Sequence, residues 1–583
     1  MSDSYLFLII FVLVLVFLAL IGSRQRRDAR RRLMQQLSQS YGKTPDEAGF
    51  RLKEMPAERY AQVPAYFHHH PMPFQIDDIT WNDLEMDEVY ARINQCQCAA
   101  GEEYLYYLLR TPAGSMRDLA YTEEQLGFAE KNRESALKLQ MLLHGIASPG
   151  KYSLYQYLDL LDELPEPSIG IHVILDVLLI VSFVVMLLTG GYGILFFILM
   201  LAVNVVTYFR SKAGTEPYLV SFAYLLRMIQ GAGPISEISA PAFSEEMGEL
   251  ASLYKSFAGF VRGSGLLIPS GEGSGNPLDI LMDYIRILFH LDLIKFGRML
   301  KEVRARRDDL DRMVTILGRL DTAICIASFR SSLKNGWCTP QMEENTSERK
   351  PHFAAEDLYH PLILKPVTNS IESGRCVLVT GSNASGKSTF LKAAALAVLL
   401  GETIGTACAK ACHFNFFRIY SSMALRDNLQ GSESYFIVEI KSLKRILDAA
   451  KEKELPPVMA FVDEVLRGTN TVERISAGTE VLRGFSEEGI LCYAATHDLE
   501  LTELLSDAYD NYHFREEVKG EDIFFSYRLL PGKATTRNAI LLLSAIGYDQ
   551  TIVDRASARA AGFIETGKWM DTDTGKDQSE GAR

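Results

Sequence analysis

The chain has 583 residues and a formal net charge of −13, and its composition is 48% hydrophobic and 23% charged. These values exclude a disordered or collagen-like chain, and the length suggests about four domain-sized units. The negative net charge excludes a generally basic surface of the kind that neutralises nucleic-acid phosphates. It is compatible with a local basic groove. Eight cysteines without a C-x-x-C pair indicate neither a disulfide framework nor a zinc ribbon.

Residues 5–21 form an uncharged apolar segment that is long enough to cross the ~30 Å hydrocarbon core of a membrane. Asp3 precedes this segment without any Lys or Arg, whereas a cluster of arginines follows it between Arg24 and Arg32. A secretory signal peptide has the opposite order of charge. The pattern therefore favours an uncleaved anchor with its arginines on the cytoplasmic side.

A second apolar region is divided by a glycine-containing turn and predicts a helical hairpin of two spans, 171–188 and 194–209. Both spans are apolar all round, unlike core helices, which have one apolar face. Asp176 and Asn204 lie at the same depth from one membrane face. They either hydrogen-bond across the hairpin or extend separately to the interface.

Three spans with the N-terminus outside would place residues 23–168 and 211–583 on the same, cytoplasmic side. We therefore expect a multi-pass protein of the cell membrane, with membrane lipid among its partners. Reduced free thiols fit the cytoplasmic compartment.

A glycine loop follows a predicted strand at 375–380 and precedes a helix-forming run. The sequence G-S-N-A-S-G-K-S-T satisfies the pattern G-x-x-x-x-G-K-[ST], whose backbone N–H groups wrap a phosphate chain. In such a loop Lys387 reaches the β and γ phosphates and Ser388 ligates Mg²⁺. The predicted nucleotide site consists of Gly381, Ser382, Asn383, Ala384, Ser385, Gly386, Lys387, Ser388 and Thr389.

Two later segments end predicted buried strands with polar side chains. The first ends with Asp463, which we expect to hold Mg²⁺ directly or through water, and Glu464, which we expect to polarise the attacking water. An acidic pair at a strand end is ordinarily a surface turn, but the phosphate loop upstream favours the functional interpretation. The second ends with His497, whose imidazole can reach a γ-phosphate or its water, with a structural histidine as the alternative.

A one-sided helix is predicted after Ser434, because apolar residues from Phe436 to Leu447 recur at spacings of three and four. Its serine-rich start is either an N-cap or an anion site supplied in trans to a nucleotide on a second subunit. We expect Ser434 to make this contact.

These segments together resemble the ATPase domain of the MutS family of DNA mismatch-repair proteins. The family's phosphate loop looks like residues 380–392, its acidic strand end and the loop after it look like 461–471, and its histidine switch looks like 495–501. Its trans-acting signature is similar to residues 427–440. The short histidine-proline segment before its nucleotide fold is similar to 359–363.

The resemblance implies an α/β P-loop NTPase domain of the MutS/ABC type that binds and hydrolyses ATP with Mg²⁺. It also implies a homodimer formed through this domain, with residues 529–540 similar to the family's dimerisation portion. The roles that it implies are catalysis for Glu464, His497 and Lys387, metal binding for Ser388 and Asp463, and contact with the partner's nucleotide for Ser434.

The resemblance is weaker outside this domain. Residues 96–112 look like the start of the family's helical core. The basic stretch from Lys295 to Arg312 would be the lever that returns from this core. The alternative for this basic stretch is a solvated helix face. We find no N-terminal module with the family's Phe-x-Glu mismatch-reading motif, and no convincing strand-rich clamp in 213–290. Leu466 also stands in place of a glycine. We therefore expect the protein to bind DNA only weakly.

Two other segments contain metal-ligand residue types. Cys408, Cys412 and His413 are close in sequence, but thiolate sites need more ligands at matched spacing, and buried free cysteine is the expected state. The histidines from His68 to His70 lie in a proline-containing stretch that we interpret as a linker.

The predicted fold class is thus an α/β P-loop NTPase domain with an all-α lever and core region and three transmembrane helices. We interpret the chain as a membrane-anchored MutS-like ATPase whose dimer closes on ATP and reopens on hydrolysis. The alternatives are a DNA mismatch or branched-DNA binding protein at the membrane and a transporter-type ATPase. The expected segments are an anchor at 5–21, a cytoplasmic helical region at 23–168, the hairpin at 171–209, a helical lever region at 211–345, the ATPase domain at 346–565 and a disordered tail at 566–583.

Overall fold

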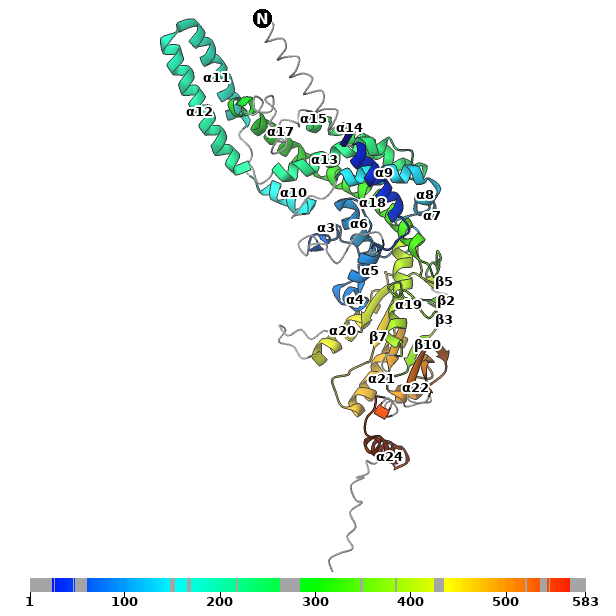
Figure 1. Cartoon of the computed structure of the whole chain (residues 1–583). Helices are drawn as coiled ribbons and strands as arrows, with labels where there is room; N and C mark the ends of the chain where they lie inside the picture. The colour runs from blue at the N-terminus through cyan, green and yellow to red at the C-terminus, as the bar shows by residue number, and fades with distance from the viewer. Residues whose placement is uncertain are drawn as a thin grey trace, which may run out of the picture. The chain divides into compact units, whose positions relative to one another are not determined.

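The chain folds into two units, drawn in Figure 1. Unit 1 comprises Met1–Pro73, Tyr90–Leu109 and Tyr121–Ser332, and unit 2 comprises Phe74–Val89, Arg110–Ala120 and Leu333–Arg583. The computed structural model describes residues 24–25, 27–45, 47, 60–146, 153–164, 169–215, 219–262, 284–346, 350–382, 385–423, 435–519, 522–534, 540, 543–544 and 546–566.

Some of the sequence-based predictions fall outside these described residues. They are the first transmembrane span at 5–21, the tail after residue 566, and the site residues Asn383, Ala384 and Ser434. All of these stay predictions.

Unit 2 is built on a six-stranded sheet with the strand order β10-β9-β4-β8-β7-β6. The five strands from β9 to β6 run parallel, and β10 returns antiparallel to β9. All residues of β4 and β8 are buried, which is typical of parallel strands covered by helices on both faces. The strands are β4 (Cys376–Thr380), β6 (Arg418–Ser422), β7 (Val458–Asp463), β8 (Leu491–Thr496), β9 (Tyr509–Lys519) and β10 (Asp522–Pro531).

Helices alternate with these strands along the chain, which confirms the predicted α/β class of this part. They are α19 (Lys387–Ile404), α20 (Tyr435–Ala450), α21 (Thr471–Glu487) and α22 (Leu499–Leu504), with α24 (Gln550–Thr566) near the C-terminus. A second, four-stranded sheet has the order β1-β5-β2-β3. Its strands are β1 (Gln341–Glu343), β2 (Phe353–Leu358), β3 (Asn369–Ser373) and β5 (Ala411–Asn415).

An N-terminal segment covers β6, the edge strand of the six-stranded sheet. Helix α4 (Asp78–Asp83) places Thr80 Oγ1 3.2 Å from the backbone N–H of Ser421 and Asp83 Oδ2 2.8 Å from that of Met423. The same Asp83 carboxylate accepts a bond from Ser421 Oγ at 2.7 Å. These bonds occupy backbone donors that would otherwise be open to pairing with another chain.

This arrangement differs from the sequence-based division, which kept residues 23–168 together. Residues 74–89 and 110–120 lie with unit 2 because their polar groups bond to it. Arg445 of α20, for example, pairs with Asp77 at 2.7 Å. The sequence contains no composition change that marks these short segments.

Unit 1 contains helices and no strand among its described residues. The basic stretch from Lys295 to Arg312 is divided between α17 and α18, which are separated at Arg306. The helices are α3 (Ala65–His69), the end of α5 (Met86–Ile93), most of α6 (Ala99–Arg110), α7 (Glu123–Leu126), α8 (Phe128–Lys131), α9 (Arg133–Ile146), α10 (Leu154–Glu163), α11 (Ile169–Thr189), α12 (Gly191–Thr215), α13 (Leu219–Ser236), α14 (Ser244–Ser256), α15 (Ala258–Val261), α17 (Leu291–Ala305) and α18 (Arg307–Ser332), with a short 3₁₀ turn at Pro241–Phe243.

Helices α6 and α18 approach each other closely at two glycines. A Cβ atom on Gly318 would lie 2.7 Å from the carbonyl oxygen of Ala100, and one on Gly101 would lie 2.3 Å from Asp321 Oδ2. Asp321 accepts a hydrogen bond from the backbone N–H of Cys98 at 2.9 Å. Complete burial raises the pKa of its carboxyl group to about 7 despite this bond.

Helices α11 and α12 form the predicted apolar hairpin, seen as the pair of long helices in Figure 1. Their most apolar windows have mean hydropathies of 2.8 and 2.1, and only 11% and 17% of these windows is buried. Both helices are long and apolar enough to cross a membrane, by length and composition. The described residues thus contain two such helices, where the sequence predicted three in the whole chain.

The sequence left two alternatives for Asp176 and Asn204, and the structure shows a third arrangement in which another residue lies between them. His290, just before α17, has its Nδ1 atom 2.7 Å from Asp176 Oδ1 and its Nε2 atom 3.1 Å from the carbonyl oxygen of Asn204. The Asn204 amide group donates across the hairpin to the carbonyl oxygen of Leu175 at 3.4 Å. A polar group in an apolar hairpin needs such partners, and the histidine contacts the Asp176 side chain of α11 and the Asn204 backbone of α12.

We expect Gly318→Ala to destabilise the protein by about 1–3 kcal/mol, because its methyl group would overlap backbone and side-chain atoms of α6. The measurement is the midpoint of thermal unfolding. Gly248→Ala is the matched control, since Gly248 also lies within a helix but a Cβ atom there meets nothing within 4 Å. Equal midpoints for the two variants would contradict the close approach of α6 and α18.

Candidate functional site

Three neighbouring parallel strands bring the predicted site segments to one edge of the six-stranded sheet. Thr380 at the end of β4 is paired with Thr496 at the end of β8, and Asp463 at the end of β7 is paired with Ala495 of β8. The chain continues from these ends into the glycine loop, Glu464 and His497, respectively. The three segments therefore meet outside the carboxyl ends of the strands, where open α/β sheets bind ligands.

The glycine loop depends on two backbone conformations that favour glycine. Gly381 has φ 151° and Gly386 has φ 106°, and α19 begins directly after Gly386. The Lys387 ammonium group donates hydrogen bonds to the carbonyl oxygens of Gly381 at 2.8 Å and Ser382 at 2.7 Å. The positive charge is thus held over the loop, next to the N-terminus of α19, where anions are stabilised.

The geometry of this loop fits a bound nucleotide with Mg²⁺. Ser388 Oγ donates a hydrogen bond to Asp463 Oδ2, which puts two oxygen ligands of the kind that Mg²⁺ prefers side by side. Ser385 Oγ is buried and has no hydrogen-bond partner among the residues that the structure describes. A buried hydroxyl of this kind is expected to have a partner, which a phosphate oxygen would supply.

Glu464 is held in a defined position by three neighbours. Its Oε1 atom is 2.6 Å from His497 Nε2, its Oε2 atom is 2.5 Å from Arg467 Nε, and its backbone N–H donates to Ala495 at 2.9 Å. Its φ of 59° is in the left-handed region, a strained conformation that is common at functional sites. Partial burial alone would raise the pKa of this carboxyl group, but the hydrogen bond from His497 and the charges of His497, Arg467 and Lys387 lower it below its ordinary value.

His497 lies between Glu464 and Lys387, since its Nε2 atom is also 3.5 Å from Lys387 Nζ. The next residue, Asp498, accepts two hydrogen bonds from the Arg474 guanidinium group, at 2.9 and 2.7 Å. This bidentate pair fastens the turn after β8 to α21. The structure therefore brings the candidate base, the imidazole and the loop lysine into one cluster.

The cluster lines a cavity of about 600 Å³. Its other walls include Tyr359, His360, Phe390, Phe514 and Tyr527, so an aromatic and apolar region adjoins the phosphate loop. Burial lowers the pKa of His360 to about 4, which keeps this imidazole neutral at pH 7. The predicted site residues that line the cavity are Ser382, Ser385, Gly386, Lys387, Ser388, Thr389, Asp463, Glu464 and His497.

Several residues of the site were missed by the sequence analysis. Arg467, the partner of Glu464, follows it by three residues in the segment that resembled the MutS family, and this spacing was the only signal. Glu439 of α20 accepts a hydrogen bond from the backbone N–H of Leu466, and nothing in the helix pattern marks it. Phe514 and Tyr527 come from β9 and β10, which no motif covers.

Leu466, which stands in place of a family glycine, keeps a backbone conformation that favours glycine. Its φ is 56° and its side chain is 4% exposed. It packs with Val465 and Phe485 in the core beside β7. Burial of an apolar side chain thus offsets the strain of the left-handed conformation at this position.

Comparisons with known proteins agree with this geometry. The family model described as MutS domain V matches residues 377–563. DNA mismatch repair protein MutS of Thermus thermophilus is 28% identical over 268 residues, which is 45% of this chain and 31% of that protein. DNA mismatch repair protein MutS 2 of Haloarcula marismortui is 33% identical over 184 residues, 31% of this chain and 19% of that protein.

The matched segment thus spans about a third or less of the length of these relatives. The family-model match contains β4 from Val377 onward, the glycine loop, Glu464 and His497, so the likeness and the candidate site coincide. Over this shared segment the chain is similar to the MutS family.

Proposed function

We propose that this protein is a membrane-anchored ATPase of the MutS type that binds and hydrolyses ATP with Mg²⁺ at a dimer interface. The observation that carries the proposal is the convergence of Lys387, Ser388, Asp463, Glu464 and His497 on one cavity. A lysine over a glycine loop, two oxygen ligands and a carboxylate are the groups that phosphoryl transfer requires.

Glu464 is the group that orients and polarises the attacking water in this proposal. Its lowered pKa keeps it ionised at neutral pH, and His497 and Arg467 fix its two oxygens. Lys387 stabilises negative charge on the phosphates, and Ser388 and Asp463 hold Mg²⁺, which supplies further charge neutralisation when it is bound.

The proposed dimer is supported by the resemblance of residues 427–440 to the family's trans-acting signature. Ser434 comes directly before α20, whose Glu439 is bonded to Leu466 two residues after Glu464. In this proposal, Ser434 contacts nucleotide bound to a second copy of the chain, and hydrolysis reopens the dimer.

Membrane anchoring is supported by the exposed apolar surface of α11 and α12. Side chains such as Leu187, Leu188, Leu195 and Val206 are more than 60% exposed along this hairpin. A soluble protein rarely exposes a continuous apolar surface of this extent, whereas a membrane covers it with lipid. In this proposal the hairpin lies in the cell membrane together with the span predicted from the sequence at 5–21, and the ATPase unit lies in the cytoplasm.

A second candidate function is recognition of mismatched DNA, which the names of the relatives favour. The basic stretch from Lys295 to Arg312 gives it little support, because many of its cations are already bonded within unit 1. Lys295 donates to the carbonyl oxygens of Gly259, Phe260 and Arg262, and Arg312 pairs with Glu249 at 2.6 Å. Cations engaged in this way are poorly available for DNA phosphates.

Lys387→Ala and Glu464→Gln should separate ATP binding from hydrolysis. Loss of the ammonium group removes a charge-assisted contact to the phosphates and should raise the Kd for ATP about 10- to 100-fold. Glu464→Gln should retain ATP binding but lower turnover about 100- to 10,000-fold, because the general base is lost. The measurements are nucleotide affinity, steady-state phosphate release and particle mass, since the Glu464→Gln protein should accumulate as the ATP-bound dimer.

Glu480→Gln is the control for this experiment, since Glu480 is an exposed carboxylate of α21 outside the cavity. It should hydrolyse ATP at the rate of the unmodified protein. Turnover at that same rate by Glu464→Gln would show that another group activates the water.

Accessibility of single added cysteines should reveal the topology of the hairpin. An impermeant thiol reagent applied to intact cells should label Gly191→Cys, in the turn of the hairpin, and spare Ser38→Cys. Both positions are exposed in the structure, so burial does not decide the outcome. Permeabilised cells should show labelling of both, and the opposite pattern in intact cells would place the ATPase unit outside.

DNA binding should be weak and strongly dependent on salt, with a preference for mismatched over matched duplex of less than about tenfold, or ~1.4 kcal/mol. The reasons are the acidic chain and the engagement of the basic stretch within unit 1. The test is titration of the detergent-solubilised protein with matched, mismatched and four-way-junction DNA, with and without ATP. Nanomolar, mismatch-selective binding at physiological salt would instead support the second candidate function.

A further inference from the structure

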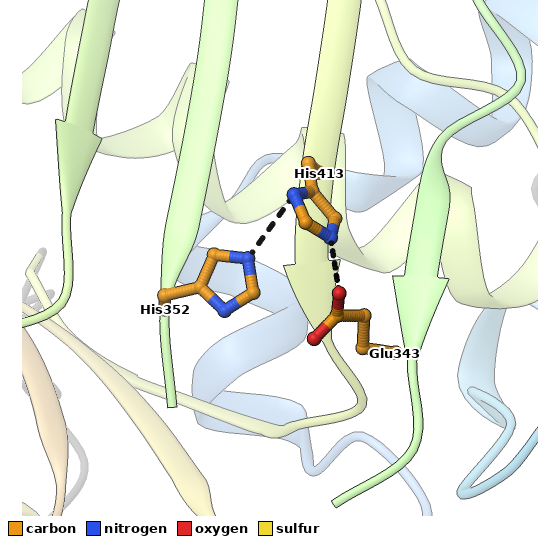
Figure 2. A group of neighbouring side chains, drawn as sticks. All are labelled: Glu343, His352 and His413. Atoms are coloured by element: carbon orange, nitrogen blue, oxygen red, sulfur yellow. Dashed lines mark hydrogen bonds and ion pairs between the residues drawn. The ribbon is translucent and has the colours of Figure 1, made fainter. Parts of the chain in front are cut away.

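Three side chains on the four-stranded sheet of unit 2 converge away from the nucleotide cavity. Figure 2 shows Glu343 of β1, His413 of β5 and His352, which directly precedes β2. His413 lies between the other two, with its Nε2 atom 3.1 Å from Glu343 Oε1 and its Nδ1 atom 3.3 Å from His352 Nε2. One ligand atom from each residue lies within 4.8 Å of the other two.

The pairing of the strands explains why these residues share one face of the sheet. His413 is opposite Gln341 of β1 and opposite Ala354 of β2. Glu343 is two residues after Gln341, and His352 is two residues before Ala354, so both side chains point to the same side as His413. The backbone of His352 is also fixed to β5, because its N–H donates to Asn415 Oδ1 at 2.9 Å.

Two imidazoles and one carboxylate are a ligand set that binds zinc and related divalent metals. In a tetrahedral zinc site with bonds of about 2.0–2.1 Å, neighbouring ligand atoms are about 3.3 Å apart. The contacts of His413 with Glu343 at 3.1 Å and with His352 at 3.3 Å are close to this spacing, although they use different nitrogens of its ring. All three side chains are partly exposed, which leaves room for the rotation that would bring one nitrogen of His413 into position with both neighbours.

We propose that Glu343, His352 and His413 form a binding site for a divalent metal ion of the zinc class. The ion takes one ligand from β1, one from β5 and one from the residue directly before β2, and water completes its coordination. It thereby fastens β1, a strand of only three residues at the edge of the sheet, to β5 and β2. This site is separate from the Mg²⁺ site at Ser388 and Asp463 and does not depend on the proposed ATPase function.

The cysteines near His413 do not belong to this site. Cys412 is the neighbour of His413 on β5, so its side chain points to the opposite face of the sheet, where it is 4% exposed. Burial raises the pKa of its thiol group, which disfavours the thiolate that a metal requires. Cys408 and Cys412 are both buried free cysteines, as expected from the sequence, whereas His413 has a different role in this proposal.

The test is to measure zinc binding by the full chain purified in detergent, after removal of metal and with excess Mg²⁺ present. The unmodified protein should retain one more equivalent of Zn²⁺ in equilibrium dialysis than the double variant His352→Ala, His413→Ala. With Co²⁺ as the probe, the unmodified protein should show visible absorption from a site with nitrogen ligands, and the double variant should lose it. His144→Ala, which removes an exposed histidine of α9, should change neither result.

Glu343→Gln keeps the size and hydrogen-bonding capacity of the side chain but removes the charged ligand. Loss of a residue that only supports a metal ligand weakens binding about 10- to 100-fold. Because Glu343 is itself a ligand in this proposal, Glu343→Gln should weaken Zn²⁺ binding by at least this factor. This variant decides the question if the double variant fails to fold, as judged by ATP binding. Equal Zn²⁺ stoichiometry and Co²⁺ absorption in the unmodified protein and the ligand variants would overturn the proposal.

Discussion

The proposed nucleotide site depends on the parallel pairing of β8 with both β4 and β7. This pairing places the ends of three strands side by side, although the glycine loop, Glu464 and His497 are far apart in the sequence. A shift of β7 by one residue would turn Asp463 to the other face of the sheet and separate it from Ser388. The buried side chains of β4 and β8 hold this register, so the core of the sheet determines the geometry of the site.

Much of this site could be predicted because each of its parts is encoded locally. The phosphate loop needs glycines at fixed positions. Polar residues at the end of a buried strand can be recognised because the residues before them are apolar. The pair of Arg467 with Glu464 depends on the turn after β7, which residue types alone do not define. The cluster of Glu343, His352 and His413 depends on the register of two strand pairs, and no spacing in the sequence encodes such a register.

The hairpin shows the same difference between local and distant information. Its two apolar spans could be recognised from composition, because a lipid-facing helix needs apolar residues on every side. The residue that joins the Asp176 side chain to the Asn204 backbone could not be recognised, since His290 is 86 residues beyond Asn204 and has no distinctive sequence around it. The requirement for a partner was therefore predictable from physical chemistry, but the identity of the partner was not.

The covering of β6 by α4 has a consequence for synthesis of the chain. Asp83 leaves the ribosome 338 residues before Ser421, its hydrogen-bond partner. At a synthesis rate of about 5–20 residues per second, the strand that α4 covers would be made about 17–70 s after α4. During that interval the hairpin emerges, so the membrane insertion proposed for it would precede closure of the sheet. A fragment that begins at residue 346 would lack α4 altogether and would expose the β6 edge to other chains.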